Sequence, residues 1–524
     1  MAGLSSVTID KFRGLNTTKE ELSLIPGQLS KNQNYLYMAS GGLKERGGGA
    51  KLSSPPSVGK LYSLDNYVNE NRLEFLITNQ GTDSYYYSSG WNALSLTLTS
   101  NLKTRWAQAG SGALTALYGV NGADSVIKIS GVTPTGSLVA SSPTTCTDIE
   151  RHKNRLFAID NTSLYFTEVL AYDTWNTGTN KIDIAPGVDG KCTALEVWGD
   201  SLFIFKEYGV YVLPNASDPT PTTSWLILRT DAAMGTNSPD TVKRTKNGIY
   251  YLSTDNFIRN LSPVVTFSSG EFTLGGSGTP IISLGIESVL EDDLSDSNKK
   301  NASAIVFNDL YIISFKTVKN IGSYNNVTYF ADTNKFIQYE GVIEPQPYWG
   351  QFTGYDYDYF TTQLDSGLLR LYGAKGTSNE GEVHETLNND INNDDGKPIN
   401  SVAILGWLPI GGESIYKKIK QIYFVGDTED WDIELTFNAY KFNTIIPSDG
   451  EGTQRSYRSK TGVSSFIGTA IMGTSIMTGL STGSERFRTS LKGYYFKAEM
   501  KNQNANEFTR IDKIVVYYRP IKNK

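Results

Sequence analysis

The chain contains few residues of the kinds that most often perform catalysis or bind metals. Its only imidazoles are His152 and His384, and its only thiols are Cys146 and Cys192. These four residues do not have the spacing of a zinc site, and no nucleophile elbow, phosphate-binding loop or dinucleotide fingerprint is found. We therefore interpret the histidines as surface residues and expect the cysteines to be buried, reduced and separate.

Two groups of acidic residues could in principle bind a cation. Asp390, Asn392 and Asp394 have the first spacings of a calcium loop, but Asp395 stands where that loop needs glycine and Ser401 where it needs glutamate. We interpret this stretch as a polar turn between domains. The second group is interpreted as the solvated face of a helix: Glu291, Asp292, Asp293 and Asp296. The paired carboxylates of a glycosidase would come from distant strands, so their spacing in the sequence cannot locate them. From the residues above, the sequence predicts no cofactor, no metal, no catalytic residue and no enzyme activity.

The composition favours an all-β protein built from many short strands. Among 524 residues there are 50 glycines, 18 prolines and 31 tyrosines, and only 19% of the residues are charged. This profile argues against a helical bundle, a coiled coil or a disordered chain. The net charge of −6, without any basic run, disfavours a protein that grips nucleic-acid phosphates. The scarcity of cysteine and the lack of a secretory leader indicate synthesis in a reducing cytoplasm.

An internal repeat predicts the architecture. CTDIERHKNRLFAID, from Cys146, and CTALEVWGDSLFIFK, from Cys192, share Cys-Thr, a glutamate at the fifth place and Leu-Phe at the eleventh and twelfth. Similar β-rich runs start at Asn71, Ala113, Asn247, Asn308 and Ser366. Hairpins repeating every 40 to 60 residues or so are typical of a β-propeller, here of six or seven blades. Eight residues should then occupy equivalent strands: Leu156, Phe157, Leu202, Phe203, Ile249, Tyr250, Leu310 and Tyr311. The alternative is a large β-sandwich with unrelated hairpins.

The pattern of repeats and alternating apolar residues divides the chain into three parts. Residues 1–54 are expected to form an N-terminal arm, residues 55–398 the β-propeller and residues 399–524 an antiparallel β-sandwich. Longer alternating strands after residue 399 predict the sandwich. Within the propeller, the stretch 281–300 predicts a short inserted helix, since four apolar residues have helical spacing: Ile286, Val289, Leu290 and Leu294.

The stretch 464–484 of the sandwich contains a near-exact pentapeptide repeat, Gly-Thr-Ala-Ile-Met followed by Gly-Thr-Ser-Ile-Met. Bulky apolar residues among glycine and threonine suit an extended loop that packs on another surface. One interpretation is a strap on its own sandwich. The other is a contact to another subunit or the lining of a shared channel, with contact residues Phe466, Ile467, Ile471, Met472, Ile476 and Met477 and hinges Gly468 and Gly473.

Residues 12–48 resemble the opening of tail hub or nozzle proteins of short-tailed bacteriophages, also called packaged-DNA stabilisation proteins. The residues that match the pattern of that family are Gly14, Leu15, Asn16, Pro26, Asn34, Gly42, Leu43, Arg46 and Gly48. Further similar stretches are NGADSVIKISG from Asn121, RHKNRLFAIDNTSLYFTEVLAYDTWN from Arg151 and DDGKPI from Asp394. The likeness covers nearly the whole chain, although each motif is short.

The resemblance implies a structural virion component rather than an enzyme. In that family six copies form a ring below the portal and adaptor, the propellers stand at the periphery, and the ring encloses the DNA exit channel. The chain would then be a homo-hexameric tail nozzle of the virion, assembled in the host cytoplasm. It would retain the packaged genome, contact adaptor or connector proteins, carry fibres or spikes, and let double-stranded DNA pass without sequence-specific binding. Residues 12–48 and the sandwich would lie nearest the neighbouring subunits. The alternative is a receptor-binding or glycan-processing β-propeller protein of a phage tail.

Overall fold

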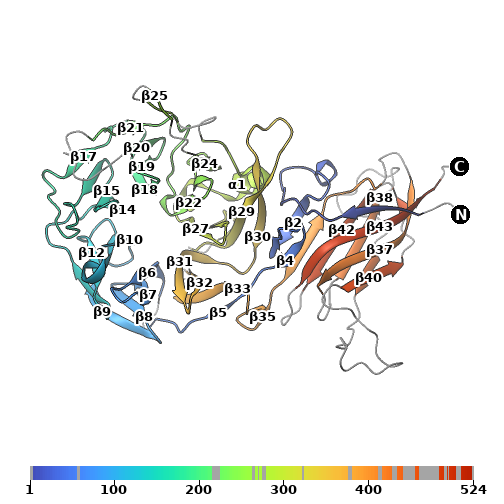
Figure 1. Ribbon diagram of the computed structural model, residues 1–524, viewed down its shortest axis with the longest axis horizontal. Helices are drawn as coiled ribbons and strands as arrows, with labels where there is room; N and C mark the ends of the chain where they lie inside the picture. Colours follow the sequence, from blue (N-terminus) through green and yellow to red (C-terminus); the bar gives the residue numbers. More distant parts are fainter. Residues whose placement is uncertain are drawn as a thin grey trace.

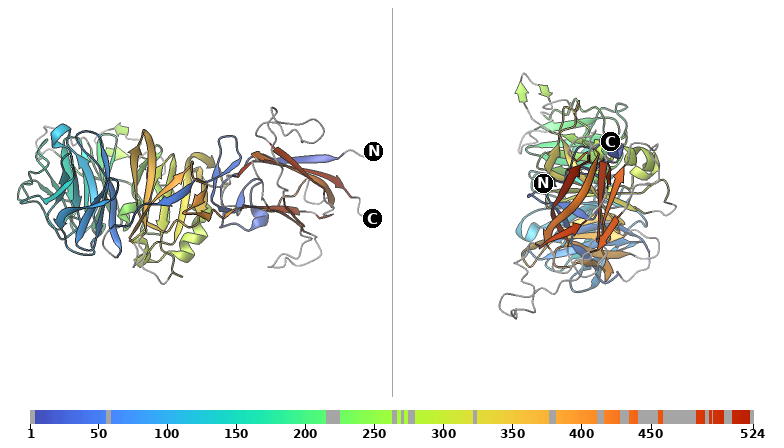
Figure 2. Two further views of the ribbon diagram at one scale, coloured as in Figure 1. Left: turned by 90° about the horizontal axis from the view of Figure 1, so that it is seen from below. Right: turned by 90° about the vertical axis from the view of Figure 1, so that its right-hand side faces the viewer.

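The computed structural model describes residues 4–55, 59–214, 225–262, 266–268, 271–273, 279–320, 324–375, 381–410, 416–427, 434–440, 455–458, 483–488, 492–493, 495–502 and 509–521. In this part of the chain β-strands predominate, and no helix is long and apolar enough to span a membrane. The molecule is elongated, with a ring of small sheets at one end and two layered sheets at the other (Figures 1 and 2). Both chain ends lie at the layered end.

Seven antiparallel sheets follow one another along the ring. The first four are formed by β6 (Leu61–Val68), β7 (Glu74–Gln80), β8 (Asp83–Tyr87) and β9 (Trp91–Thr97); β10 (Arg105–Ala109), β11 (Ala116–Val120), β12 (Ile127–Ser130) and β13 (Thr135–Leu138); β14 (Asp148–His152), β15 (Arg155–Ile159), β16 (Ser163–Phe166) and β17 (Lys181–Asp183); and β18 (Cys192–Trp198), β19 (Ser201–Lys206), β20 (Val210–Pro214) and β21 (Leu228–Arg229).

The last three sheets are less regular. The fifth is formed by β22 (Lys243–Thr245), β23 (Gly248–Leu252) and β24 (Ile258–Leu261), and is followed in the chain by a separate hairpin of β25 (Thr266–Ser268) and β26 (Glu271–Thr273). The sixth is formed by β27 (Ser303–Phe307), β28 (Leu310–Phe315), β29 (Val327–Ile337) and β30 (Gln346–Phe352). The seventh combines β31 (Tyr357–Asp365), β32 (Leu368–Lys375) and β33 (Glu382–Asn388) with β5 (Gly48–Lys51), which comes from the N-terminal part of the chain.

The seven sheets are arranged around a common centre (Figure 1). The first strand of each sheet contacts the first strand of the next, and β31 of the seventh sheet contacts β6 of the first. Clusters of buried apolar side chains fill the spaces between neighbouring sheets, for example Tyr67, Ile77 and Leu117 between the first and second. A four-stranded sheet alone would leave such faces exposed, so each sheet is stabilised by packing against its neighbours.

The repeat found in the sequence marks equivalent strands. Leu156 and Phe157 lie in β15, Leu202 and Phe203 lie in β19, and the corresponding pairs fall in β23 and β28. Each of these is the second strand of its sheet, which confirms that the eight residues lie in equivalent strands, although Leu310 and Tyr311 are one position out of register with the other pairs. Because side chains alternate along a strand, Leu156 packs toward one neighbouring sheet and Phe157 toward the other.

Short helices lie between the fifth and sixth sheets. They are η5 (Leu284–Ile286), α1 (Glu287–Asp293) and α2 (Asp296–Lys299). Ile286, Leu290 and Leu294 are buried against the sixth sheet, as their helical spacing requires. The remaining described helices are single 3₁₀ turns: η1 (Glu21–Ser23), η2 (Gly112–Leu114) and η4 (Pro239–Thr241).

The layered end contains two sheets. One has the order β3 (Tyr35–Tyr37), β4 (Leu43–Glu45), β43 (Arg510–Pro520), β37 (Lys417–Asp427) and β40 (Gly483–Arg488), with β1 (Ser5–Ile9) on β43 and β41 (Lys492–Gly493) on β37. The other has the order β2 (Leu29–Gln33), β36 (Ser401–Leu405), β42 (Tyr495–Asn502), β38 (Glu434–Tyr440) and β39 (Arg455–Arg458). Residues 1–54, expected as an arm, thus supply strands to both layers and to the seventh sheet.

The second layer continues directly into the sixth sheet of the ring. β2 pairs in parallel with β30 at Gln33 and Gln351 and antiparallel with β36 on its other side. One apolar cluster extends across this junction and includes Leu29, Phe352 and Ala403. The ring and the layered end therefore share both a sheet and a core.

Candidate functional site

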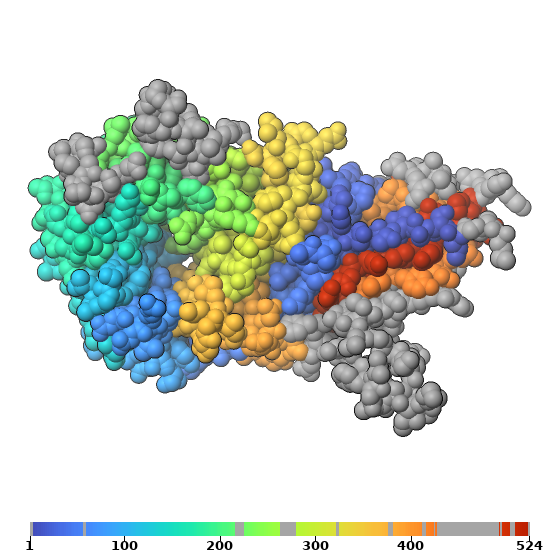
Figure 3. Space-filling view, in the orientation of Figure 1, coloured from blue at the N-terminus to red at the C-terminus, as the bar shows by residue number. Residues whose placement is uncertain are grey.

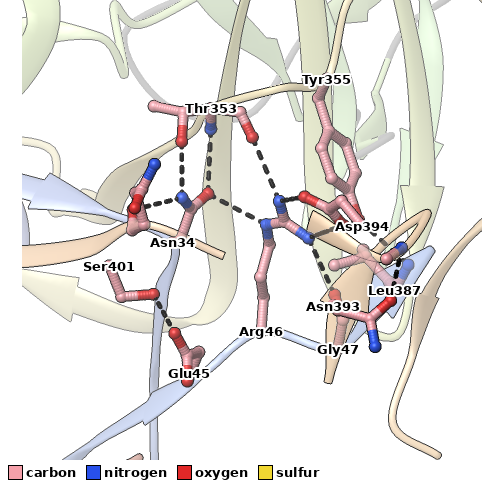
Figure 4. Close-up of polar contacts among 12 residues, drawn as sticks. Asn34, Glu45, Arg46, Gly47, Thr353, Tyr355, Leu387, Asn393, Asp394 and Ser401 are labelled. Carbon is pink, nitrogen blue, oxygen red and sulfur yellow. Dashed lines mark hydrogen bonds and ion pairs between the residues drawn. The ribbon is translucent and has the colours of Figure 1, made fainter. Parts of the chain in front are cut away.

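Arg46 lies at the centre of a polar joint between the ring and the layered sheets (Figure 4). The side chain is fully buried. Its Nη1 donates to Asp394 Oδ1 at 2.9 Å and to the Gly47 carbonyl at 3.0 Å, and its Nη2 donates to the second Asp394 oxygen. Its Nε donates to Asn34 Oδ1 at 2.9 Å, and Nη2 also reaches the Thr353 carbonyl at 3.1 Å. One guanidinium thus joins the N-terminal segment, the end of the sixth sheet and the linker after the seventh.

Asn34 and Gly48 occupy positions in this joint that few other residues could take. Asn34 has a φ of +63°, in the left-handed region that asparagine tolerates. Its amide donates to the Asn400 carbonyl at 2.7 Å, and its Oδ1 accepts from the Thr353 N–H at 2.9 Å. A Cβ atom on Gly48 would lie 2.1 Å from the Asn393 carbonyl oxygen, so the close approach of the two backbones requires glycine.

An aromatic ring covers the buried guanidinium. The ring of Tyr355 lies 4.3 Å from the Arg46 Cζ atom, a cation–π contact. The Tyr355 hydroxyl accepts a hydrogen bond from the Leu387 N–H at 3.0 Å, which holds the tyrosine side chain against the seventh sheet (Figure 4). Acceptors from nearby residues and from Thr353, Tyr355 and Asp394, more than 300 positions away, therefore surround the guanidinium.

Glu45, next to Arg46 in the chain, is buried among three hydrogen-bond donors. The Ser401 hydroxyl donates to Oε1, while Asn502 Nδ2 and the Thr509 N–H donate to Oε2 at 3.0 Å and 3.2 Å. Burial raises the pKa of Glu45 to about 7, although these hydrogen bonds favour the charged form. The carboxyl group links β4 to β36 and β42, so it connects the two layers.

A second polar site lies at the axis of the ring. A cavity of about 140 Å³ is lined by residues from the first strands of all seven sheets, and Figure 3 shows a narrow opening near the middle of the ring. The charged residues that line it are Asp65, Lys103, Arg105, Asp148, Glu150, Glu196, Asp240 and Lys243. So many charges in a small space must be paired or protonated.

Asp240 is the centre of the paired charges at the axis. It accepts from Arg105 Nε at 2.7 Å and forms an ion pair with Lys103. Burial alone would raise the pKa of Asp240, but the charges of Arg105 and Lys103 bring it well below its usual range. Asp148 instead accepts from the backbone N–H of Leu195 at 2.7 Å, and burial raises its pKa to about 6.

Glu150 and Glu196 are the fifth residues of the two sequence repeats, and they lie side by side at the axis. They come from adjacent first strands, β14 and β18, and both line the cavity. Burial raises the pKa of each, the charge of Glu196 raises that of Glu150 further, and the charge of Lys243 opposes the shift in both. Sequence reasoning missed this site, although the repeated glutamate was a signal for it.

The histidines are not surface residues, so that prediction was wrong. His152 is 2% exposed and His384 is 6% exposed. Both sit in strands packed on two faces, where alternate positions are buried in either direction. Burial lowers the pKa of His152 to about 4 and also lowers that of His384, whose Nε2 lies 3.1 Å from Glu382 Oε2.

The two cysteines and the calcium-loop candidate Asp394 lie in different parts of the fold. Cys146 and Cys192 are both buried and free, as predicted. Asp394 belongs to the Arg46 joint, in the hairpin of β34 (Asn393–Asp394) and β35 (Lys397–Pro398). Within the described ranges no group of three or more His, Cys, Asp or Glu residues is placed to hold a metal ion. The eight residues of the predicted Ile/Met loop, 466–477, lie outside the described residues.

Comparisons with known proteins do not assign the chain to a family. No family model and no curated protein matches it. Among solved structures, the computationally designed protein Ika8 is 11% identical with a TM-score of 0.35, covering 64% of this chain and 99% of its own. PorZ, a surface component of the type-IX secretion system of Porphyromonas gingivalis, is 11% identical with a TM-score of 0.39, covering 71% of this chain. The match spans 44% of PorZ. Similarities this weak carry no argument about function.

Proposed function

We propose that the ring of sheets is a seven-bladed β-propeller. The contact between β31 and β6 supports a closed ring, since it brings the seventh sheet against the first. β5 supports it further, because a strand from before the first sheet completes the seventh and ties the two ends of the ring together. The separate apolar clusters between neighbouring sheets are what radial packing requires.

We propose that the protein is a structural virion component, a homo-hexameric tail nozzle that forms the DNA exit channel. One observation carries this proposal. Among the residues that resemble the nozzle family, Asn34, Arg46, Gly48 and Asp394 lie together where the ring joins the layered end. Residues of two of the similar stretches, Arg46 and Asp394, thus meet across 348 positions of the chain, which favours a shared architecture over chance similarity.

The direct test of this proposal is a cryo-EM reconstruction of the particle that contains the protein. We expect six copies around one axis, below the portal and adaptor, with the layered ends facing their neighbours and the propellers outward. Each contact between copies should bury far more than the roughly 1,600 Å² of a standard interface. A particle with three or twelve copies would contradict the proposal.

Fibres or spikes would attach, in this proposal, to the propeller turns of the seventh, first and second sheets. Exposed leucines there are Leu73 and Leu114, between the first and second strands, and Leu364, Leu368 and Leu369, at the adjoining ends of β31 and β32. The Leu364 N–H donates to Glu74 at 2.7 Å, so the first and seventh turns are neighbours. Replacing Leu364, Leu368 and Leu369 with serine should leave the ring intact and remove the fibres. Asp309→Ser, in the equivalent turn of the sixth sheet, is the control.

The axial cavity favours one alternative, a glycan-processing propeller protein of a phage tail. Two carboxylates with raised pKa and the side chains of Trp106 and Tyr359 line it, as in sites that cleave glycosides. Its volume is below the roughly 300–1,000 Å³ of small-molecule sites, which favours the structural role. The purified chain should therefore leave labelled host-surface oligosaccharides uncleaved. Cleavage that is lost in Glu150→Gln and Glu196→Gln would favour the alternative.

A further inference from the structure

We propose that the free edge of β1 and the groove beside it bind an extended, acidic segment of a neighbouring virion protein. The proposal rests on the structural role proposed above and deepens it, since it names a docking surface and the chemistry of its partner. Three independent features of the described residues support it: an open strand edge, an apolar groove along that edge, and two cations without carboxylate partners.

The first feature is the strand edge. β1 pairs antiparallel with β43 from Ser5 and Tyr518 to Ile9 and Ile514. No described strand pairs with its other side, and in the described ranges residues 5–9 make no backbone hydrogen bond outside this ladder. An open edge offers N–H and C=O groups that an added strand can bind, with main-chain hydrogen bonds providing affinity.

The second feature is the groove. It has a volume of about 260 Å³ and is lined by residues 7–11, by Arg13, by the turn at Pro26 and Gly27, and by residues 408–410. The apolar side chains at the base of the groove are held in place by packing, because Ile9, Leu408 and Ile410 are buried in the core. The walls are held by the backbone, since the Arg13 N–H donates to the Gly27 carbonyl at 2.8 Å. Alternate side chains of an added strand would point into this groove.

The third feature is the charge at one end of the groove. Lys11 and Arg13 both line it, and among the described residues neither forms an ion pair. The one carboxylate in the lining is that of Asp10. On a chain with a net charge of −6, two cations without partners beside an open edge complement carboxylates on the incoming strand. This charge pattern is what selects an acidic partner over a neutral or basic one.

Three synthetic peptides test the proposal on the purified chain. The first alternates valine and threonine and ends in two glutamates, the second ends in two lysines, and the third is the first peptide with alternate amides N-methylated. By fluorescence anisotropy we expect the glutamate peptide to bind at least tenfold more tightly than the lysine peptide, and the N-methylated peptide not to bind. The double variant Lys11→Glu/Arg13→Glu should reverse the preference, while Lys31→Glu, an exposed cation outside the groove, should not.

Hydrogen–deuterium exchange provides the second readout. The glutamate peptide should protect residues 5–9 from exchange. Equal binding of the two charged peptides, no binding, or no protection of residues 5–9 would overturn the proposal. Protection that increases with protein concentration without peptide would assign the edge to a second copy and also overturn it. Because these measurements do not depend on ring formation, their failure is distinguishable from a wrong copy number in the particle.

Discussion

The buried carboxyl group of Glu45 should make the joint between the two layers sensitive to pH. Its pKa is raised to about 7 by burial, from an ordinary value of 4.5. A group whose folded-state pKa is raised adds stability below its unfolded pKa, and this contribution is lost as pH rises through the folded pKa. This rise in the pKa corresponds to about 3 kcal/mol, lost between about pH 4.5 and pH 7.

The variant Glu45→Gln isolates this contribution because glutamine does not titrate. At about pH 5 its amide group meets the same donors as a protonated carboxyl group, so we expect a loss of about 1 kcal/mol. At about pH 8 the variant escapes the cost of the buried charge. Relative to the wild type, its opening free energy should therefore shift by about 3 kcal/mol in its favour between the two pH values.

Hydrogen exchange of the Glu45 and Arg46 amides measures this opening directly, since these N–H groups donate to the Thr509 and Asn34 carbonyls at 2.8 Å and 2.9 Å. Comparing variant and wild type at one pH cancels the chemical exchange rate. The ratio of their protection should change by about 100-fold between about pH 5 and pH 8. Glu20→Gln, at an exposed glutamate, should show no change. A flat ratio for Glu45→Gln, or a change of the opposite sign, would refute the reasoning.

Four further predictions concern the joint, the axial cavity and the Ile/Met stretch. Arg46→Met should destabilise the fold by about 3–5 kcal/mol in a urea titration, because it leaves Asp394 without its buried partner; Lys31→Met is its control. Gly48→Ala should lower the melting temperature far more than Gly90→Ala, since nothing lies within 4 Å of a Cβ at Gly90. Because burial raises the pKa of Glu196, Glu196→Gln should raise the melting temperature more at about pH 8 than at about pH 5. Met472→Asp with Met477→Asp should give particles that leak DNA if 464–484 lines the channel, and no tail if it is a strap; normal particles would contradict both.

The sequence was most informative where a structural period repeats. Leu156 and Leu202 could be placed in equivalent strands because each sheet repeats the same turn and apolar run. Pairing between distant segments could not be predicted, since backbone hydrogen bonds leave little trace in side-chain type. Nothing in residues 48–51 indicates that β5 completes the seventh sheet, or in residues 29–33 that β2 joins two sheets.

The burial of polar residues also could not be predicted from the sequence. His152 and Glu45 look like surface residues in a polar local sequence, but the groups that surround them come from elsewhere. The donors to Glu45 belong to Ser401, Asn502 and Thr509, more than 350 positions away in the chain. Only the tertiary arrangement reveals that these side chains share one site, so the raised pKa of Glu45 had no sequence signal.

The origin of β5 and β2 also constrains the order of events during synthesis. Both strands are made by the ribosome before the ring begins, yet their partners lie in residues 346–405. β1 and β4 pair with β43, which ends at Pro520, so this partner is synthesised later still. The nascent chain must therefore keep β1, β2 and β5 unpaired, and β4 paired only with β3, while one sheet after another is translated and packs. Contacts of such long sequence separation form slowly, which makes the emerging segment a natural client for chaperones until the last strand arrives.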